Sequence, residues 1–307
     1  MKVEVVSVSK KKVCVLYENR VRNDGAPLYA WNVLKGMEGV EATHLLPQPD
    51  VKDFGKFDLY LWVDHGEDAL GLAHYKCPNP SAYWTSDTHL GYDFRLAKAR
   101  EFDHVFCMQK RAVEEFKRDG IANPYWLPHA VEPIAYRKGV WDGQKWMDAA
   151  PLKRYDVAFV GHINGEKRIN FLDRAFKEFP NFFYGQRFFE EAASVYNEAR
   201  ICLNISAVDD VNMRTFEVMA SGGFLLTEDI PTLHELFEDG KHLVMYKDLD
   251  DMVAKARYYI DNPEEREKIA QAGREEVLAK HTYTHRMKEM LGLLGLTAKE
   301  KETCAAR

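Results

Sequence analysis

The sequence predicts an α/β protein with two successive parallel sheets, each covered by helices on both faces. Three observations support this fold class. Short β-rich runs alternate with helical patterns along the whole chain. The runs are apolar on both faces, as expected for parallel strands that are buried on both sides. The length of 307 residues fits two domains of about 150 residues each.

The first half of the chain alternates strand candidates with helical patterns, notably Pro27–Met37 and Lys110–Arg118. In chain order the candidate strands are Val13–Tyr17, Ala42–Leu46, Leu59–Val63, Ala82–Thr85, His104–Met108 and Tyr125–Leu127. We therefore expect an N-terminal Rossmann-like domain over residues 1–136. Residues 137–154 show neither the strand nor the helix period and are expected to form a linker.

The second half repeats this pattern. Its candidate strands are Asp156–Val160, Phe182–Tyr184, Ile201–Ile205, Phe224–Thr227 and His242–Met245. Helical patterns lie between them at Ile169–Phe179, Phe189–Ala199 and Met213–Ala220. We therefore expect a C-terminal Rossmann-like domain over residues 155–281.

The tail of the chain is predicted to be helical. Asn262 is expected to cap a helix that begins at Pro263, with Glu265 completing a capping box. Residues 282–307 are expected to form a C-terminal helix, about Tyr283–Leu294, and a tail that packs back on the N-terminal domain. A helix on a membrane surface is the alternative, but the polar face lacks a long basic stretch.

Composition and charge exclude several classes of function. The net charge of −6 gives no general attraction to nucleic acid. The five cysteines are scattered without a CxxC pair, which indicates reduced thiols. No signal-peptide core and no run of roughly 18 apolar residues is present, so we expect a cytoplasmic protein with at most peripheral membrane contact. The eleven histidines are dispersed, and no metal site is expected.

The first candidate site follows the strand that ends at Val160. Gly161 begins a turn that leads into a helix with Lys167 and Arg168 near its first turn. The apolar face of this helix is expected to consist of Ile169, Leu172, Phe176 and Phe179. The helix dipole disfavours positive charge there by about 0.3 kcal/mol. A bound phosphate would compensate this cost through both cations and the backbone N–H groups. The alternative is that Glu166 neutralises a pair that faces water.

The second candidate site repeats this arrangement. A strand ending at Ile205 leads through a loop into a helix that carries Arg214 in its first turn. Glu217 is three residues further on and shares a face with Arg214, so an ion pair between them is the alternative to ligand binding. Ser221-Gly222-Gly223 is expected to end this helix in a tight turn. Open α/β sheets bind ligands at the carboxyl ends of their strands, so both sites are expected to converge on one anion, such as a nucleotide diphosphate.

These residues carry a family resemblance. The stretch from Glu190 to Met287, with its run Asn212-Met213-Arg214-Thr215-Phe216-Glu217, resembles the donor domain of group-1 GT-B glycosyltransferases of the family-4-like type. It is most similar to the branch of spore-maturation CgeB-like proteins. The resemblance extends over about Tyr155–Met287 and is looser in the first half. It implies two Rossmann-like domains that face each other across a cleft, with nucleotide-sugar in the second domain and acceptor in the first.

The resemblance also implies the roles of individual residues. Glu217 matches the glutamate that holds the ribose, and the glycine loop with its phosphate-binding cations matches the first site. The implied donor-site residues are Gly161, His162, Lys167, Arg168, Tyr184, Gln186, Arg187, Asn212, Met213, Arg214, Thr215 and Glu217. Tyr184, Gln186 and Arg187 occupy the segment where such enzymes place the base. Because protein cations and helix dipoles neutralise the diphosphate charge in such enzymes, the resemblance implies no metal or other cofactor. We expect a UDP-sugar rather than a GDP-sugar as the donor. The retaining mechanism of many members uses two glutamates eight positions apart, but here Asp209 replaces the first.

Polar residues at strand ends in the N-terminal half are candidates for the acceptor side. Asp87 and His89 follow one candidate strand, and His65 follows another. An Asp or His at such a position suits a base that deprotonates an acceptor hydroxyl, although turn and cap residues often have the same identity. Gly25 lies in a turn that, by the resemblance, approaches the donor phosphates.

The function expected from these observations is transfer of a sugar from a nucleotide diphosphate sugar to a hydroxyl acceptor. The acceptor is expected to be a glycan, a lipid-linked molecule or a small molecule rather than a nucleic acid. Two alternatives remain open. The same fold can carry out epimerisation or hydrolysis of a sugar nucleotide, and it can also serve as a non-catalytic nucleotide- or glycan-binding module.

Overall fold

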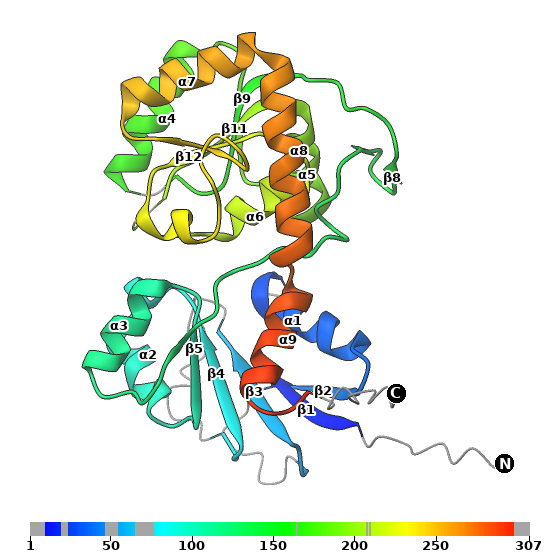
Figure 1. Ribbon diagram of the computed structural model, residues 1–307, viewed down its shortest axis with the longest axis vertical. Coiled ribbons are helices and arrows are strands. Elements are labelled where there is room, and N and C mark those ends of the chain that lie inside the picture. Colours follow the sequence, from blue (N-terminus) through cyan, green and yellow to red (C-terminus); the bar gives the residue numbers. More distant parts are fainter. Residues whose placement is uncertain are drawn as a thin grey trace, which may run out of the picture. The chain divides into compact units, whose positions relative to one another are not determined.

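The chain folds into two compact units, each with its own parallel sheet (Figure 1). The computed structural model describes residues 10–19, 24–46, 55–64, 77–163, 165–206, 208 and 210–297. Unit 1 comprises Met1–Pro128 together with Tyr283–Arg307, and unit 2 comprises His129–Thr282. The predicted α/β fold with parallel sheets is confirmed.

Unit 1 contains a sheet in the order β2-β1-β3-β4-β5-β6 among the described residues, and its paired strands run parallel. The strands are β1 (Lys11–Leu16), β2 (Val40–Leu45), β3 (Leu59–Val63), β4 (Ser81–Thr85), β5 (His104–Cys107) and β6 (Tyr125–Trp126). β3 and β4 are buried along their whole length. Continuous burial explains why these runs are apolar without alternation.

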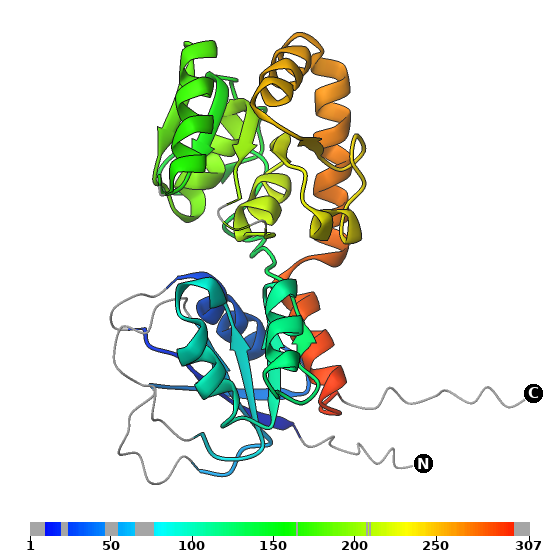
Figure 2. The ribbon, with the colours of Figure 1, turned by 90° about the vertical axis from the view of Figure 1, so that its left-hand side faces the viewer.

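Helices cover both faces of this sheet (Figure 2). They are α1 (Gly25–Gly36), α2 (Tyr92–Ala99), α3 (Lys110–Arg118) and α9 (Tyr283–Leu293), with a short 3₁₀ helix η2 (Thr88–Leu90). α2 and α3 pack with Tyr83 into one core cluster. The next residue, Trp84, points to the opposite face, where its ring lies 6.0 Å from that of Tyr283 in α9. Tyr283 also packs against Tyr29, so α1 and α9 lie side by side on that face.

Unit 2 contains a second parallel sheet in the order β10-β9-β11-β12-β13. The strands are β9 (Tyr155–Val160), β10 (Phe182–Gly185), β11 (Ala199–Asn204), β12 (Leu225–Glu228) and β13 (Val244–Tyr246). The helices are α4 (Glu166–Glu178), α5 (Phe189–Glu198), α6 (Met213–Ala220), α7 (Leu249–Asp261), α8 (Pro263–Lys280) and the 3₁₀ helix η3 (Pro231–Glu235). α4, α7 and α8 contribute to one core cluster with the central strands, and α5 and α6 contact the sheet as well.

Residues 137–154, expected to form a linker, lie in unit 2. They include a short antiparallel hairpin of β7 (Val140–Trp141) and β8 (Trp146–Met147), in which the Trp141 and Trp146 rings pack at 5.5 Å. In the part of the chain that the structure describes, no helix is long and apolar enough to cross a membrane.

The predicted buried face of α4 was wrong at two of its four positions, since Leu172 and Phe179 are buried as expected. Ile169 and Phe176 are 51% and 66% exposed, although the helical period suggested that they face the core. The buried positions are Arg168, Leu172 and Ala175, followed by the C-cap Phe179. The helix is therefore rotated so that an arginine, rather than an isoleucine, begins the buried stripe.

The predicted capping box of α8 was also wrong. The Asn262 side chain makes no capping hydrogen bond and donates instead to the Tyr258 carbonyl at 2.7 Å. The Glu265 carboxylate accepts a hydrogen bond from the Tyr258 hydroxyl. Because α7 ends one residue before Asn262, the end of that helix takes the hydrogen bonds that a free helix start would have used.

The predicted turn after α6 is confirmed. Gly222 has φ of +76°, and its N–H donates to the Met219 carbonyl. The next N–H, of Gly223, donates to the Val218 carbonyl at 2.9 Å. This pair of bonds is the Schellman ending, in which a glycine takes the left-handed position.

Candidate functional site

The carboxyl ends of β9 and β11 carry most of the predicted site residues of unit 2. β9 continues through Gly161 and His162 into α4, and β11 continues through Ile205 and Ser206 toward α6. β9 and β11 are neighbours in the sheet, so their carboxyl ends lie next to each other. Ligands of open α/β sheets bind at this edge.

Arg214 in the first turn of α6 reaches back to β9. Its Nε donates to the Val160 carbonyl at 2.6 Å, and its Nη1 donates to Asn204 Oδ1 at 2.8 Å. The guanidinium carbon lies 4.4 Å from the centre of the Phe159 ring. These contacts hold a cation at the edge where two strands end.

Arg168 in the first turn of α4 approaches the same place from the other side. Its two terminal nitrogens donate to the carbonyls of His162 at 2.9 Å and Ile205 at 3.0 Å. Its guanidinium carbon lies 5.7 Å from the Phe159 ring. Burial, followed by the charge of Arg214, lowers the pKa of Arg168 to about 10. Two guanidinium groups therefore share one small region, and their mutual repulsion favours an anion beside them.

A side chain at position 161 would collide with Arg214. Gly161 has φ of +150°, and a Cβ atom added to it would overlap Arg214 Nη2. The close approach of the turn backbone to the guanidinium therefore requires glycine. The carbonyl of the preceding residue, Val160, accepts the Arg214 Nε–H bond.

Asn204 organises this region, and the sequence analysis missed it. Its Oδ1 accepts hydrogen bonds from Arg214 and from Asn212 Nδ2, and its Nδ2 donates to Thr227 Oγ1 at 3.0 Å. The only available signal was an asparagine at the end of an apolar strand, where a buried amide needs several partners.

Asn212 begins α6 as its N-cap. Its side chain accepts a hydrogen bond from the Thr215 N–H, and Thr215 is fully buried. These residues and the half-buried Met213 thus set the position of Arg214. Their predicted contact with a ligand remains a prediction.

Lys167 pairs with an acid that the sequence did not suggest. Its Nζ lies 2.7 Å from Glu228 Oε1 at the end of β12. The expected alternatives were a bound phosphate or neutralisation by the adjacent Glu166. A carboxylate at the end of β12, which lies beside β11 in the sheet, takes part of the Lys167 charge. The predicted contact of Lys167 with a phosphate remains a prediction.

Glu217 lies one turn after Arg214 on α6 and is half-buried. Tyr196 of α5 lies near both residues. Burial, followed by the negative charge of Glu217, raises the pKa of the Tyr196 phenol well above its ordinary value, whereas nearby Arg214 opposes this shift. The carboxylate, the phenol and the guanidinium thus form one polar cluster at the start of α6.

The remaining predicted donor residues lie around β10, which is an edge strand. Gln186 Nε2 and His162 Nδ1 are 3.0 Å apart, so the loop after β10 contacts the loop after β9. Tyr184 is 48% exposed. Arg187 lies over the Phe183 ring and donates to the Gln186 carbonyl.

Unit 1 places Asp87 and His89 just after β4. Asp87 has φ of +46°, and its carbonyl accepts a hydrogen bond from the Leu90 N–H. His89 lies in η2. Its Nδ1 is buried, and no described residue hydrogen-bonds to it. Burial lowers the pKa of His89 below its ordinary value; the Asp87 charge opposes this shift, and Arg111 and Arg95 add to it.

Asp64 at the end of β3 has a structural role. Its Oδ2 accepts hydrogen bonds from Tyr83 at 2.9 Å, Thr85 at 3.3 Å and Arg95 at 2.8 Å. Arg95 and Asp64 are both buried, so the pair ties α2 to the sheet. The neighbouring candidate His65 lies outside the described residues, as does Asp209.

Gly25, the candidate for a phosphate loop, is the first residue of α1. It has φ of +68°, and no heavy atom lies within 4 Å of the position that a Cβ would take. The backbone conformation favours glycine here, and the space beside it is open. Its predicted approach to a ligand remains a prediction. Among the described residues, no group of three His, Cys, Asp or Glu side chains could hold a metal ion.

A protein-family model described as glycosyl transferase-like matches residues 137–292, which is half of the chain. The chain belongs to the glycosyl transferase-like family. The spore protein CgeB of Bacillus subtilis (strain 168) is 22% identical over 232 residues, which cover 66% of this chain and 72% of CgeB. The expected membership of the group-1 glycosyltransferases is therefore confirmed, and CgeB is one of the proteins to which the chain is similar.

Solved glycosyltransferase structures share the fold. An α-glucosyltransferase in complex with UDP-glucose and DNA containing an abasic site has a TM-score of 0.66 at 10% identity, over 93% of this chain and all of that chain. Anabaena Alr3699/HepE in complex with UDP and glucose has a TM-score of 0.63 at 11% identity, over 94% of this chain and all of that chain. S. aureus TarM has a TM-score of 0.57 at 12% identity over 76% of this chain, and the match spans only 55% of TarM. The GT-B fold predicted for this glycosyl transferase-like protein is confirmed.

Proposed function

We propose that this protein transfers a sugar from a nucleotide diphosphate sugar, preferably a UDP-sugar, to a hydroxyl group of a glycan, a lipid-linked molecule or a small molecule. The observation that carries the proposal is the convergence of Arg168 and Arg214 beside Gly161, at the carboxyl ends of β9 and β11. Solved structures with the same fold contain UDP or UDP-glucose. Their ligands support this choice of donor.

The proposed chemistry is electrostatic. Breaking the bond between the sugar and the diphosphate leaves negative charge on the departing phosphate oxygens. Arg168 and Arg214 are already fixed by carbonyls and by the Phe159 ring, so they need little rearrangement to stabilise that charge. α4 and α6 both begin at the carboxyl ends of the strands, so their first N–H groups and the positive ends of their dipoles lie at the same edge of the sheet as the two arginines.

In this proposal the two arginines and Lys167 supply the positive charge, and no metal ion is needed. We further propose that the anomeric configuration is retained, as the resemblance implies. A ¹H NMR spectrum of the product tests this point directly. An α-linked product from an α-linked donor supports retention, and a β-linked product contradicts it.

Product analysis tests the activity itself. Purified protein is incubated with UDP-glucose and related UDP-sugars, with and without an array of hydroxyl acceptors. Release of UDP together with a glycosylated acceptor supports transfer. Sugar and UDP formed without any acceptor indicate a hydrolase, an isomeric UDP-sugar indicates an epimerase, and donor binding without product indicates a binding module.

Replacing Glu217 by Ala is expected to raise KM for the donor about tenfold or more, because the proposed hydrogen bonds from the carboxylate to the ribose hydroxyls are lost. The KM is measured over a range of UDP-sugar concentrations at saturating acceptor. Glu264→Ala provides the control, since Glu264 is an exposed glutamate at the start of α8. A Glu217→Ala enzyme with unchanged donor KM would remove Glu217 from the proposed donor site.

His89 is proposed to act as the base that takes the proton of the acceptor hydroxyl. Its pKa lies below the ordinary value of about 6.5, so the ring is neutral and able to accept a proton at pH 7. We expect kcat/KM to fall as the pH decreases through an apparent pKa below 6.5, and to level off above it. Because the pKa of His89 is lower in the folded protein than in the unfolded chain, protonation of His89 favours unfolding. The free energy of unfolding is therefore expected to decrease as the pH falls below about 6.5.

The variant His89→Asn checks this proposal. His104→Asn is the control, because His104 begins β5 and lies at the edge of the sheet opposite to His89, which follows the parallel strand β4. Loss of the acidic limb of the pH profile together with a large fall in kcat supports a base. An unchanged profile in His89→Asn would transfer the role to another group, of which Asp87 is the first candidate.

A further inference from the structure

A second polar pocket lies in unit 2, away from the proposed donor site. Its volume is about 730 Å³, and its charged lining residues are Arg137, Lys138, Asp148, Lys153, Glu267 and Arg274. Asn197 near the end of α5 and Gly222 just after α6 also line it. In a parallel sheet with returning helices, the helices end at the amino edge of the strands. The pocket is therefore at the edge opposite to Arg168 and Arg214.

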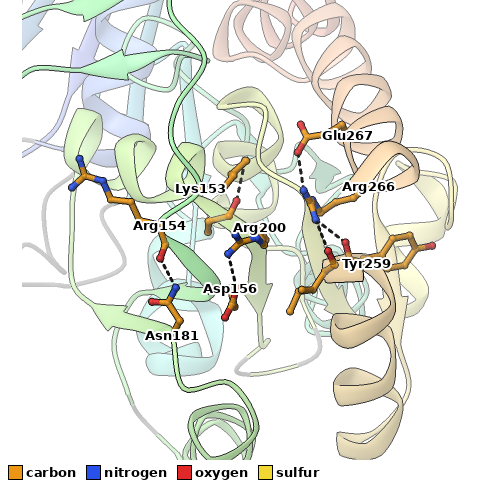
Figure 3. A network of polar contacts seen from close by, with 10 residues as sticks. Lys153, Arg154, Asp156, Asn181, Arg200, Tyr259, Arg266 and Glu267 are labelled. Carbon is orange, nitrogen blue, oxygen red and sulfur yellow. Dashed lines mark hydrogen bonds and ion pairs between the residues drawn. The ribbon is translucent and has the colours of Figure 1, made fainter. Parts of the chain in front are cut away.

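Positive charge prevails in this pocket. Four cationic side chains face two carboxylates, Asp148 and Glu267. Part of the Glu267 charge is already taken, because Arg266 Nη2 lies 3.4 Å from its Oε1 (Figure 3). The Arg266 guanidinium is buried and also donates to the Tyr259 and Ile260 carbonyls. The balance of the lining thus favours an anion.

Lys153 is held in place by the backbone. Its Nζ donates to the carbonyls of Asn197 and Ala199, both at 3.0 Å. An ammonium group has three N–H donors, so one remains for a ligand. Burial lowers the pKa of Lys153 and nearby Lys138 adds to this shift, whereas the Glu267 charge opposes it. An anion in the pocket would relieve the crowding of these positive charges.

Arg274 and the segment Arg137–Gly139 complete the cationic lining. Arg274 is half-buried on α8, and no described residue accepts a hydrogen bond from its buried Nε. The segment is fixed by Asn197, whose Oδ1 accepts from the Gly139 N–H and whose Nδ2 donates to the Arg137 carbonyl. The methylene groups of Lys138 lie where a side chain at Gly222 would be. The cations therefore stand on a fixed framework.

We propose that this pocket binds the phosphate group of a small molecule, independently of the donor site. Arg274 supplies a planar donor for phosphate oxygens, and Lys138 and Lys153 supply ammonium groups. The site is separate from the proposed transfer reaction, since no residue that lines it belongs to the loops after β9 and β11.

Isothermal titration calorimetry on the full-length protein tests this proposal. The probes are inorganic phosphate, glucose 6-phosphate and neutral glucose, each titrated first without UDP and then in the presence of saturating UDP. UDP fills the donor site, so heat from a phosphate-containing probe then reports a second site. We expect both phosphate probes to bind and glucose not to bind. Tighter binding of glucose 6-phosphate points to a sugar phosphate, and equal binding points to free phosphate.

The variant Arg274→Gln is expected to weaken binding of the preferred probe about tenfold, because a charge-assisted hydrogen bond is lost. Lys138→Gln is a second variant, at an exposed position where the fold is not at risk. UDP affinity is measured in parallel and is expected to be unchanged, which shows that the variants are folded. Three results would each overturn the proposal: no phosphate binding, phosphate binding that UDP abolishes, or unchanged affinity in both variants. None of them bears on sugar transfer itself.

Discussion

Replacing Arg214 by Gln is expected to lower kcat/KM for sugar transfer by about 10²- to 10³-fold, the effect of removing one fixed donor from a developing negative charge. Arg214 makes contacts with Val160, Asn204 and the Phe159 ring, and it lies near Arg168. With a neutral amide at position 214, Arg168 is the only guanidinium of this pair that remains to stabilise the departing diphosphate. The measurement is steady-state transfer from UDP-sugar at several donor concentrations.

Two further variants separate charge from structure. Arg214→Lys keeps the charge without the planar group and is expected to restore part of the activity. Arg200→Gln is a matched control. Arg200 pairs with Asp156 at the amino ends of β11 and β9, so it lies outside the proposed site at the carboxyl ends of these strands. Melting temperatures identify any loss of folding that follows from losing one of the two hydrogen bonds to Asn204 Oδ1. If folded Arg214→Gln retained full activity, the proposed role of Arg214 would be wrong.

Replacing Gly161 by Ala is expected to weaken donor binding at least tenfold and to destabilise unit 2 by about 1–3 kcal/mol. The added methyl group would overlap Arg214 Nη2, and the residue would have to keep φ of +150°. Either the guanidinium or the loop must move. UDP titration and thermal unfolding measure the two effects.

Gly165→Ala is the matched control for this substitution. Gly165 also has positive φ, +80°, and lies in the same loop, but no heavy atom lies within 4 Å of its Cβ position. It therefore carries the backbone strain without the collision. Equal losses of UDP affinity in the two variants would attribute the effect of Gly161→Ala to the backbone rather than to Arg214.

Much of the fold could be predicted from the sequence, because strands buried on both faces leave continuous apolar runs. β3 was predicted with the bounds that it has, and α6 likewise. The rotation of α4 could not be predicted, since it depends on Arg168 finding the His162 and Ile205 carbonyls in the folded chain. Hydrophobic periodicity alone placed Ile169 in the core, where the structure has the arginine instead.

The candidate site was predictable in outline and not in its connections. Unfavourable cations at two helix starts indicated where charge gathers, and the structure brings Arg168 and Arg214 together around Phe159. Lys167 pairs with Glu228, which lies 61 positions later in the chain, and no local sequence pattern predicts such a pair. Asn204 was missed for the same reason, because the partners of its side chain come from two other segments, the start of α6 and β12.

The central claim is that Arg168 and Arg214 bind the diphosphate of a nucleotide donor. The most direct test is a calorimetric comparison of UDP and uridine binding to the wild-type protein and to Arg214→Gln. We predict that the wild-type protein binds UDP about a hundredfold more tightly than uridine, and that this preference falls at least tenfold in the variant. Equal affinity for UDP and uridine in the wild-type protein, or an undiminished preference in Arg214→Gln, would contradict the account.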